Sequence, residues 1–301
     1  MENIISLSDI LSDTSEPPEA IVEGGILLKD TMLVIIGSAK AGKTFLGMNL
    51  ALSVASGTEF LGFNVKQSKK VLYLCAEGGY YPNRDRLKIM SKSIDKTATH
   101  NASFHFNSNL SLEDDHDYEK FLKIIEEFKP EVLILDPFIR FHSVDENSSQ
   151  DINLIMRRLR VVINEYNLSI VLIHHKGKNV SRGGRGSSVI DGEYDSAIYL
   201  DREGAHHKLK FDMRHVESPE DMLVNFCPHS YWFNAVSKKD LDPVVNYICN
   251  NKNTTRSSIV KEWISNNTYS RSHCYKLIDG AINKGYVIEI GNGELDIREE
   301  M

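Results

Sequence analysis

The sequence predicts an α/β protein built on a mostly parallel sheet, with a second, smaller domain towards its C-terminal end. Short apolar runs rich in Val, Ile and Leu alternate with longer helical patterns between about residues 30 and 175. After residue 190 such runs follow one another directly, and after residue 240 helical patterns return. Alternating strands and helices are typical of α/β domains with helices on both faces of the sheet.

Four apolar runs are too short for helices and apolar on both faces, as buried parallel strands are. They are MLVII (32–36), VLYLC (71–75), VLILD (132–136) and SIVLI (169–173). Between them, residues 117–128 and 151–166 carry apolar side chains at helical spacing. Four later runs predict hairpins that extend the same sheet: 196–200, 207–214, 221–226 and 231–234.

Three domains follow: an N-terminal arm (1–20), a main domain (21–236) and a C-terminal domain (241–301), with a polar linker at 236–242. The C-terminal part has helical patterns at about 242–250, 256–265 and 271–284, then two strands around a Gly-Asn-Gly turn. This order predicts a winged helix. The arm is polar and acidic with a Pro-Pro pair, which favours a disordered tail over an arm that docks on an adjacent subunit.

Composition indicates a soluble cytoplasmic protein. Of the 301 residues, 41% are hydrophobic and 26% charged, and no apolar run approaches the roughly 18–20 residues that cross a bilayer. The first residues lack the pattern of a secretory signal. The four cysteines have no metal-ligand spacing, so we predict neither disulfides nor a structural metal. The net charge of −7 excludes a general basic coat but allows a local basic channel.

Residues 37–44 match the phosphate-binding pattern G-x-x-x-x-G-K-[ST], between an apolar strand and an amphipathic helix. Such a loop points successive N–H groups at phosphate oxygens beside a helix N-terminus. We expect Lys43 to neutralise the β- and γ-phosphates of ATP and Thr44 to offer its hydroxyl to Mg²⁺. The predicted nucleotide-binding residues are Gly37, Ser38, Ala39, Lys40, Ala41, Gly42, Lys43, Thr44 and Phe45.

Polar residues follow three of the other predicted strands. Asp136 ends one strand, where a carboxylate completes a magnesium site. Glu77 lies just past another, where it can orient or deprotonate the attacking water. His174 and His175 end a third, at the sheet edge where α/β proteins bind ligands. One of them is a candidate γ-phosphate sensor; spacing does not decide which, although His174, first past the strand, is favoured.

A Gly/Arg/Ser-rich stretch, NVSRGGRGSS (179–188), follows these histidines. Such a cationic loop suits a grip on a phosphate backbone or a reach into a neighbouring subunit.

With these residues in place, the chain resembles the RepA-type hexameric replicative helicases of plasmids, within the wider group of RecA-like ATPases. The resemblance rests on five segments and covers roughly residues 20–235. The segments are GSAKAGKT, YLCAEGG, LILDPFIRFHSVDENSSQD, LIHHKGK and SRGGRGSSVIDGEYD. It implies a catalytic base at Glu77, magnesium at Thr44 and Asp136, and a phosphate sensor at His174 or His175.

The resemblance also implies a homo-oligomeric, hexameric ring in which an arginine finger enters the next subunit's site. Arg185 is the first candidate for that finger. RecA-like helicases often carry Lys-x-Arg on a late strand, but this chain has Asp212-Met213-Arg214, so Arg214 is the other candidate. A second departure is the predicted winged helix, which compact helicases of this family do not need.

The resemblance places the loops 139–151 and 177–186 towards a central channel for single-stranded DNA. The predicted DNA-binding residues there are Arg140, Lys178 and Arg182, with most of the grip assigned to the second loop. In the C-terminal domain, Arg271 and Lys276 are expected on the exposed face of a recognition helix. That domain is expected to bind duplex DNA or a replication protein.

Three hypotheses about function remain. The first is an ATP-driven, ring-shaped helicase that moves on single-stranded DNA. The second is a DNA-bound RecA-like ATPase that regulates or loads without unwinding, which the winged helix and the net acidity favour. The third is a small-molecule P-loop kinase, which needs neither Glu77 nor the Gly/Arg loop.

Overall fold

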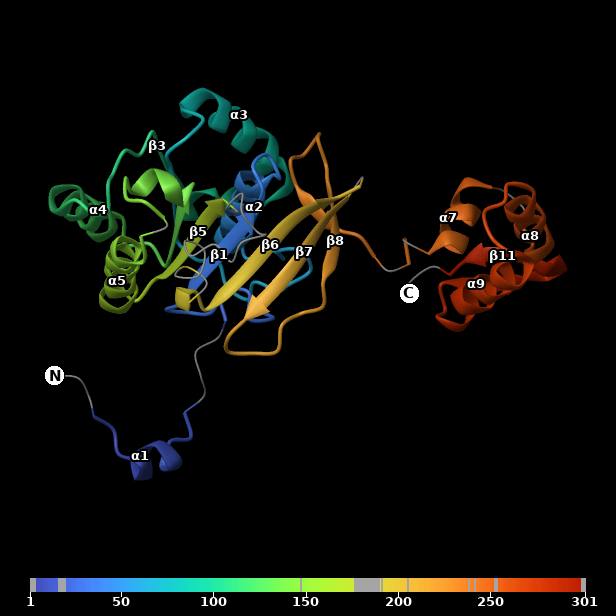
Figure 1. Cartoon of the computed structure of the whole chain (residues 1–301), viewed down its shortest axis with the longest axis horizontal. Helices are drawn as coiled ribbons and strands as arrows, with labels where there is room; N and C mark the ends of the chain where they lie inside the picture. The colour runs from blue at the N-terminus through green and yellow to red at the C-terminus, as the bar shows by residue number, and fades with distance from the viewer. Residues whose placement is uncertain are drawn as a thin grey trace. The chain divides into compact units, whose positions relative to one another are not determined.

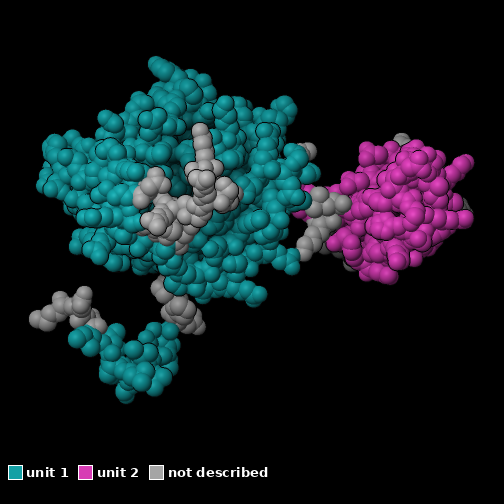
Figure 2. Space-filling model, viewed as in Figure 1, with its two compact units in different colours: residues 1–234 teal, residues 235–301 magenta. Residues whose placement is uncertain are grey.

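The computed structural model describes residues 4–15, 20–146, 148–175, 190, 192–204, 206–237, 239–240, 242–251 and 254–298. They form two compact units, residues 1–234 and 235–301 (Figure 2). The division falls beside the polar stretch in which the sequence predicts a linker. No helix in these ranges is both long and apolar enough to span a membrane.

The first unit is built on a nine-stranded sheet with the order β3-β2-β4-β5-β1-β6-β7-β8-β9 (Figure 1). Strands β1 to β6 pair in parallel, and β6-β7-β8 continue the sheet as an antiparallel meander. The strands are β1 (Met32–Gly37), β2 (Val71–Cys75), β3 (Ala102–Phe106), β4 (Val132–Asp136), β5 (Ser169–His175), β6 (Ser196–Glu203), β7 (His206–Met213), β8 (Met222–Phe226) and β9 (Phe233–Ala235). The α/β class with a mostly parallel sheet is therefore confirmed.

Helices cover both faces of this sheet, because alternate residues of its strands are apolar on both sides. On one face, α2 (Lys43–Ser56) and α3 (Tyr80–Met90) pack on Leu33 and Ile35 of β1. On the other, α4 (Asp115–Phe128) and α5 (Ser149–Tyr166) pack on Met32 and Val34. Both cores leave the carboxyl ends of β1, β2, β4 and β5 together at one edge.

Two short elements were not expected from the sequence. The helix α1 (Leu7–Ser12) lies in the predicted arm, where Ser6 caps it by accepting a hydrogen bond from the amide of Asp9. It buries no side chain. Strand β3 (ASFHF) forms the outer edge of the sheet and is only partly buried, so it lacks the apolar pattern that reveals the inner strands.

The second unit has its own core, formed by α7 (Pro243–Asn250), α8 (Arg256–Ser265), α9 (Arg271–Asn283) and the antiparallel pair β10 (Val287–Ile290) and β11 (Glu294–Ile297). Val244, Trp263 and Ile278 are among its buried residues. The order of three helices and a hairpin matches the prediction. That it acts as a winged helix remains a proposal.

Candidate active site

A pocket of about 460 Å³ lies at the carboxyl edge of the parallel strands. It is lined by Ala39, Lys40, Gly42, Lys43, Thr44, Phe45, Glu77, Arg86, Asp136, Pro137, Ile173 and His175. These residues come from the ends of β1, β2, β4 and β5 and from the first turn of α2. The predicted phosphate-binding, acidic and histidine motifs thus meet in one place.

The glycines of the phosphate-binding loop are needed for space and for conformation. A Cβ on Gly37 would lie 2.5 Å from the carbonyl oxygen of Leu200 on β6. Gly42 has φ +96°, and a Cβ there would meet the Phe233 ring at 2.9 Å. Ordinary residues adopt such positive φ values only at a cost. The tight turn can therefore end directly at the N-terminus of α2.

Lys43 is buried and held by the loop that contains it. Its ammonium group donates to the carbonyl oxygens of Gly37 (2.9 Å) and Ser38 (2.8 Å). Its Nζ also lies 3.0 Å from Nδ1 of His175. Burial lowers the pKa of Lys43, and the nearby carboxylate of Asp136 partly offsets this. The lysine therefore lies in the pocket beside the helix N-terminus, where phosphate oxygens would bind.

Thr44 and Asp136 form the expected metal-binding pair. The Thr44 hydroxyl lies 3.3 Å from Oδ1 of Asp136, and the buried Tyr73 hydroxyl donates to Oδ2 at 2.7 Å. Burial raises the pKa of Asp136, and the charge of Glu77 adds to this effect. A hydroxyl beside a carboxylate that is costly to ionise alone fits a hard divalent cation such as Mg²⁺.

Glu77 lines the same pocket just beyond β2. Its backbone carbonyl accepts a hydrogen bond from the amide of Asn83 at 3.0 Å, and that amide also binds the carbonyl of Gly79. Asn83 is buried at the start of α3, so it fixes the turn that carries the glutamate. The carboxylate is half exposed and accepts a bond from Nε of Arg140 at 2.7 Å.

The two histidines at the end of β5 face opposite sides of the sheet. His175 lines the pocket with Ile173, whereas His174 is buried on the other face beside Glu146. The preference for His174 as the residue facing the nucleotide is therefore wrong. Successive side chains of a strand alternate between faces, and the face that includes Ile173 is the one covered by α2.

The contact with Lys43 defines the protonation of His175. An ammonium group can only donate, so Nδ1 of His175 accepts and the ring proton lies on Nε2. Burial and then the charge of Lys43 lower the pKa of His175. A neutral ring with one N–H donor is suited to a hydrogen bond with a phosphate oxygen.

His174 belongs to a separate buried cluster with His142 and Glu146. Oε1 of Glu146 lies 3.7 Å from Nε2 of His142 and 3.7 Å from Nδ1 of His174. Within the described part of the chain these three atoms have no hydrogen-bond partner. Burial lowers the pKa of His174 to about 4 and raises that of Glu146. Among the described residues no group of three His, Cys, Asp or Glu is arranged to hold a metal.

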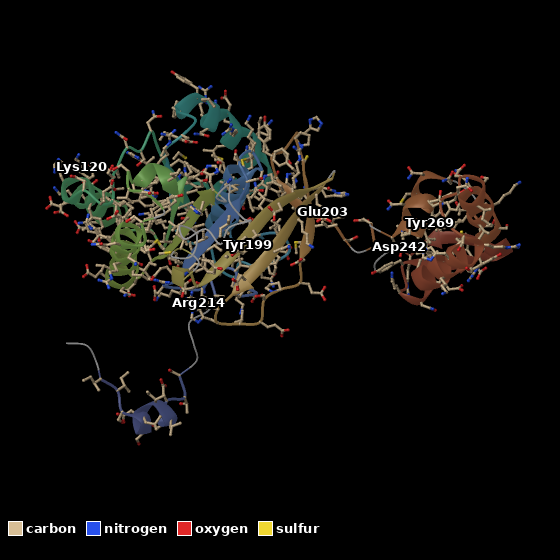
Figure 3. The ribbon with its side chains drawn as sticks, viewed as in Figure 1. Lys120, Tyr199, Glu203, Arg214, Asp242 and Tyr269 are labelled. Atoms are coloured by element: carbon tan, nitrogen blue, oxygen red, sulfur yellow. The ribbon has the colours of Figure 1, made fainter. Side chains whose placement is uncertain are left out.

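The predicted arginines are distributed differently. Arg214 lies just past β7, at the end of the β6–β7 hairpin opposite Glu203 (Figure 3). Its guanidinium donates to the carbonyl of Gly192 and lies over the Tyr194 ring. Since β6 ends beside Gly37, Arg214 is at the edge of the sheet away from the pocket of its own chain. The predicted Lys178, Arg182 and Arg185 lie outside the described residues.

Sequence reasoning missed three residues of the site: Tyr73, Asn83 and Arg86. Arg86 lines the pocket, bonds Oδ1 of Asn83 and lies over the Phe45 ring at 5.1 Å. The helical pattern that follows Glu77 was the available signal, because a helix beginning there turns one face towards the pocket. Tyr73 reads as one more apolar strand residue until β2 is paired with β4.

In the second unit, the predicted Arg271 and Lys276 are exposed on α9. The wider basic surface is smaller than the composition implies. Arg256 pairs with Asp279 at 2.6 Å and Lys284 with Asp242 at 3.4 Å. These two charges are satisfied within the unit, so the first turns of α9 carry the basic residues available for a partner.

The fold and the pocket together define a RecA-like P-loop ATPase. A family model described as an AAA domain matches residues 4–181, more than half of the chain, and the chain belongs to that family. No curated protein sequence gave a match.

Two solved structures share the fold. The ATPase domain of a replicative helicase has a TM-score of 0.54 at 14% identity, over 69% of this chain and 86% of that one. A KaiC-like protein from the hyperthermophilic archaeon Pyrococcus horikoshii OT3 has a TM-score of 0.51 at 12% identity, over 72% and 94%. At these identities the likeness concerns the fold alone.

Proposed function

We propose that the chain is an ATP-hydrolysing helicase that moves along single-stranded DNA as a ring. The observation that carries the hydrolytic part is that the Glu77 carboxylate lines the same pocket as Lys43, Thr44 and Asp136. A carboxylate at that position can accept the proton of an attacking water. A small-molecule kinase, which transfers phosphate to another hydroxyl, needs no such base from this strand.

Each residue has a role in this mechanism. Lys43 and the loop amides bind the β- and γ-phosphates, and His175 donates to a γ-phosphate oxygen. Thr44 and Asp136 hold Mg²⁺, which neutralises charge that develops on the phosphates. Glu77 orients the water and accepts its proton. The pocket contributes mainly position and electrostatic stabilisation, as in other phosphoryl-transfer sites.

The ring is proposed because of where the arginines lie. Arg214 is at the opposite edge of the sheet from its own pocket, so it would serve only the site of a neighbour. Arg185 is the other candidate for this role. In other enzymes a finger supplied by a partner raises the rate by ~10³–10⁵. Hydrolysis would then depend on assembly.

DNA binding is supported by the resemblance of residues 20–235 to ring helicases and by the position of Arg140, which is exposed in the loop after β4. Lys178 and Arg182 would add phosphate contacts. The second candidate function is a DNA-bound ATPase that regulates or loads without unwinding. The separate C-terminal unit, with Arg271 and Lys276 exposed on α9, favours it.

A forked DNA substrate separates these functions. The helicase is expected to displace the labelled strand with ATP and Mg²⁺, whereas Lys43→Ala is not. Binding that weakens with salt, with a log–log slope of about −0.7 per phosphate contact, would show the single strand held by its backbone. Tight binding and ATP hydrolysis without strand displacement would favour the regulator. Absence of any DNA binding would contradict both.

A further inference from the structure

The catalytic base and a DNA-binding candidate are joined directly. Nε of Arg140 lies 2.7 Å from Oε1 of Glu77, and the two side chains are 62% and 50% exposed. Glu77 follows β2 and Arg140 follows β4, which are neighbours in the sheet. The ion pair therefore bridges two loops at the mouth of the pocket and remains open to solvent.

The loop after β4 holds Arg140 in this position. Residues Phe138–Phe141 form a single 3-10 turn in which the amide of Arg140 donates to the carbonyl of Pro137. Phe138 and Phe141 are fully buried on either side, while Ile139 is 42% exposed. The carbonyl of Phe141 also accepts the amide of Leu112. Ile139 and Arg140 are thus presented outward from an anchored base.

This pairing has a chemical consequence for Glu77. A carboxylate that accepts a charge-assisted bond from a guanidinium is held by it and is a weaker proton acceptor. A guanidinium is also the side chain best matched to a phosphodiester oxygen. A DNA phosphate and the Glu77 carboxylate, both anions, would therefore compete for Arg140.

We propose that Arg140 couples DNA to ATP hydrolysis by exchanging Glu77 for a phosphate of the single strand. Without DNA, Arg140 restrains the base. With DNA bound, Glu77 is released to take a proton from water as the water oxygen bonds to the γ-phosphorus and the bond to the β,γ-bridging oxygen breaks. The products are ADP and inorganic phosphate. This inference rests on the proposed function, because it names how DNA regulates that same site.

The exchange is accessible because the pair is exposed. Surface ion pairs of this kind shift an equilibrium by roughly 1.4- to 5-fold, so a phosphate can displace the carboxylate. Linkage then requires the reverse effect: whatever removes Glu77 as a competitor must strengthen DNA binding by the same factor. This gives a readout that does not depend on catalysis.

The first test measures steady-state ATP hydrolysis of the full chain with and without saturating single-stranded oligonucleotide. Arg140→Ala is expected to raise the rate without DNA about 1.4- to 5-fold and to abolish most of the stimulation by DNA, with KM for ATP unchanged. Arg140→Lys keeps the charge and is expected to keep stimulation. Arg157→Ala, which removes an exposed arginine of α5, is the matched control.

The second test measures binding of a fluorescent single strand by anisotropy without nucleotide. Glu77→Gln is expected to bind about 1.4- to 5-fold more tightly than the wild type. Adding Glu77→Gln to Arg140→Ala is expected to change nothing further. Affinity unaltered by Glu77→Gln would overturn the exchange.

The outcomes separate the inference from the proposed function. A wild-type chain that hydrolyses ATP equally with and without DNA overturns the DNA-dependent motor and the exchange with it. A stimulated wild type with an equally stimulated Arg140→Ala overturns only the exchange. An Arg140→Ala variant that is inactive in both conditions also overturns it, because Arg140 would then serve to position Glu77 for catalysis.

Discussion

At the scale of residues, strand alternation decides the roles of the two histidines. Identical side chains at consecutive positions reach opposite faces of β5, so His175 contacts Lys43 and His174 contacts the Glu146 cluster. The sequence supplied the pair but not its orientation, which depends on the face that α2 covers. The Arg140–Glu77 pair was equally hidden, because it joins loops 63 residues apart.

The histidine assignment predicts separate effects for the two positions. His175→Ala is expected to lower kcat by roughly 10²-fold, as loss of a charge-stabilising donor does, with folding retained. His174→Leu is expected to leave kcat near the wild-type value, because its ring faces away from the pocket. Single-turnover ATP hydrolysis measures both. The reverse pattern would restore His174 as the sensor.

At the scale of elements, the inner strands could be predicted and the outer ones less so. β1, β2, β4 and β5 are continuous apolar runs because both faces are covered. β3 carries His105 and Ser103 at an edge, so its sequence resembles a loop. The site motifs follow the inner strands, and for this reason Lys43, Thr44, Glu77 and Asp136 were found. Tyr73 and Asn83 act through tertiary hydrogen bonds that no local pattern reveals.

The buried His174 predicts a pH dependence of stability. Its pKa is about 4 in the folded chain and about 6.5 when unfolded. Between these values the unfolded state binds more protons, so the free energy of unfolding falls as pH falls from about 6.5 to 4, by about 3 kcal/mol at most. The raised pKa of Glu146 acts in the opposite direction above pH 4.5, and His142, His175 and Lys43 also face the cluster.

The wild type must therefore be compared with His174→Leu by urea denaturation at several pH values. The difference between their free energies of unfolding is expected to shift against the wild type as pH falls through this window. A difference that stays constant from about pH 7 to about pH 4.5 would show that His174 is not neutral and buried in the folded chain.

At the scale of the whole molecule, the chain combines an ATPase unit with a small unit that has its own core. The active site lies wholly within the first unit, apart from the finger that we assign to a neighbour. This arrangement predicts complementation between defective subunits. A chain lacking Lys43 still offers its arginine, and a chain lacking the finger still offers a pocket.

Mixing Lys43→Ala with Arg214→Ala is expected to restore measurable ATP hydrolysis that neither variant shows alone, and the same mixture with Arg185→Ala identifies which arginine acts. Mixed assemblies formed by co-refolding or co-expression provide the sample. If neither arginine variant loses activity alone, hydrolysis does not depend on a finger from the neighbour at these positions.

The central claim is that ATP hydrolysis at this pocket is coupled to single-stranded DNA. Steady-state hydrolysis with and without a single-stranded oligonucleotide, at low and then rising salt, tests it most directly, with Lys43→Ala as the blank. We expect strong stimulation that disappears as salt weakens the phosphate contacts. A rate that DNA leaves unchanged at every salt concentration would contradict the claim and direct attention to the C-terminal unit and its partner.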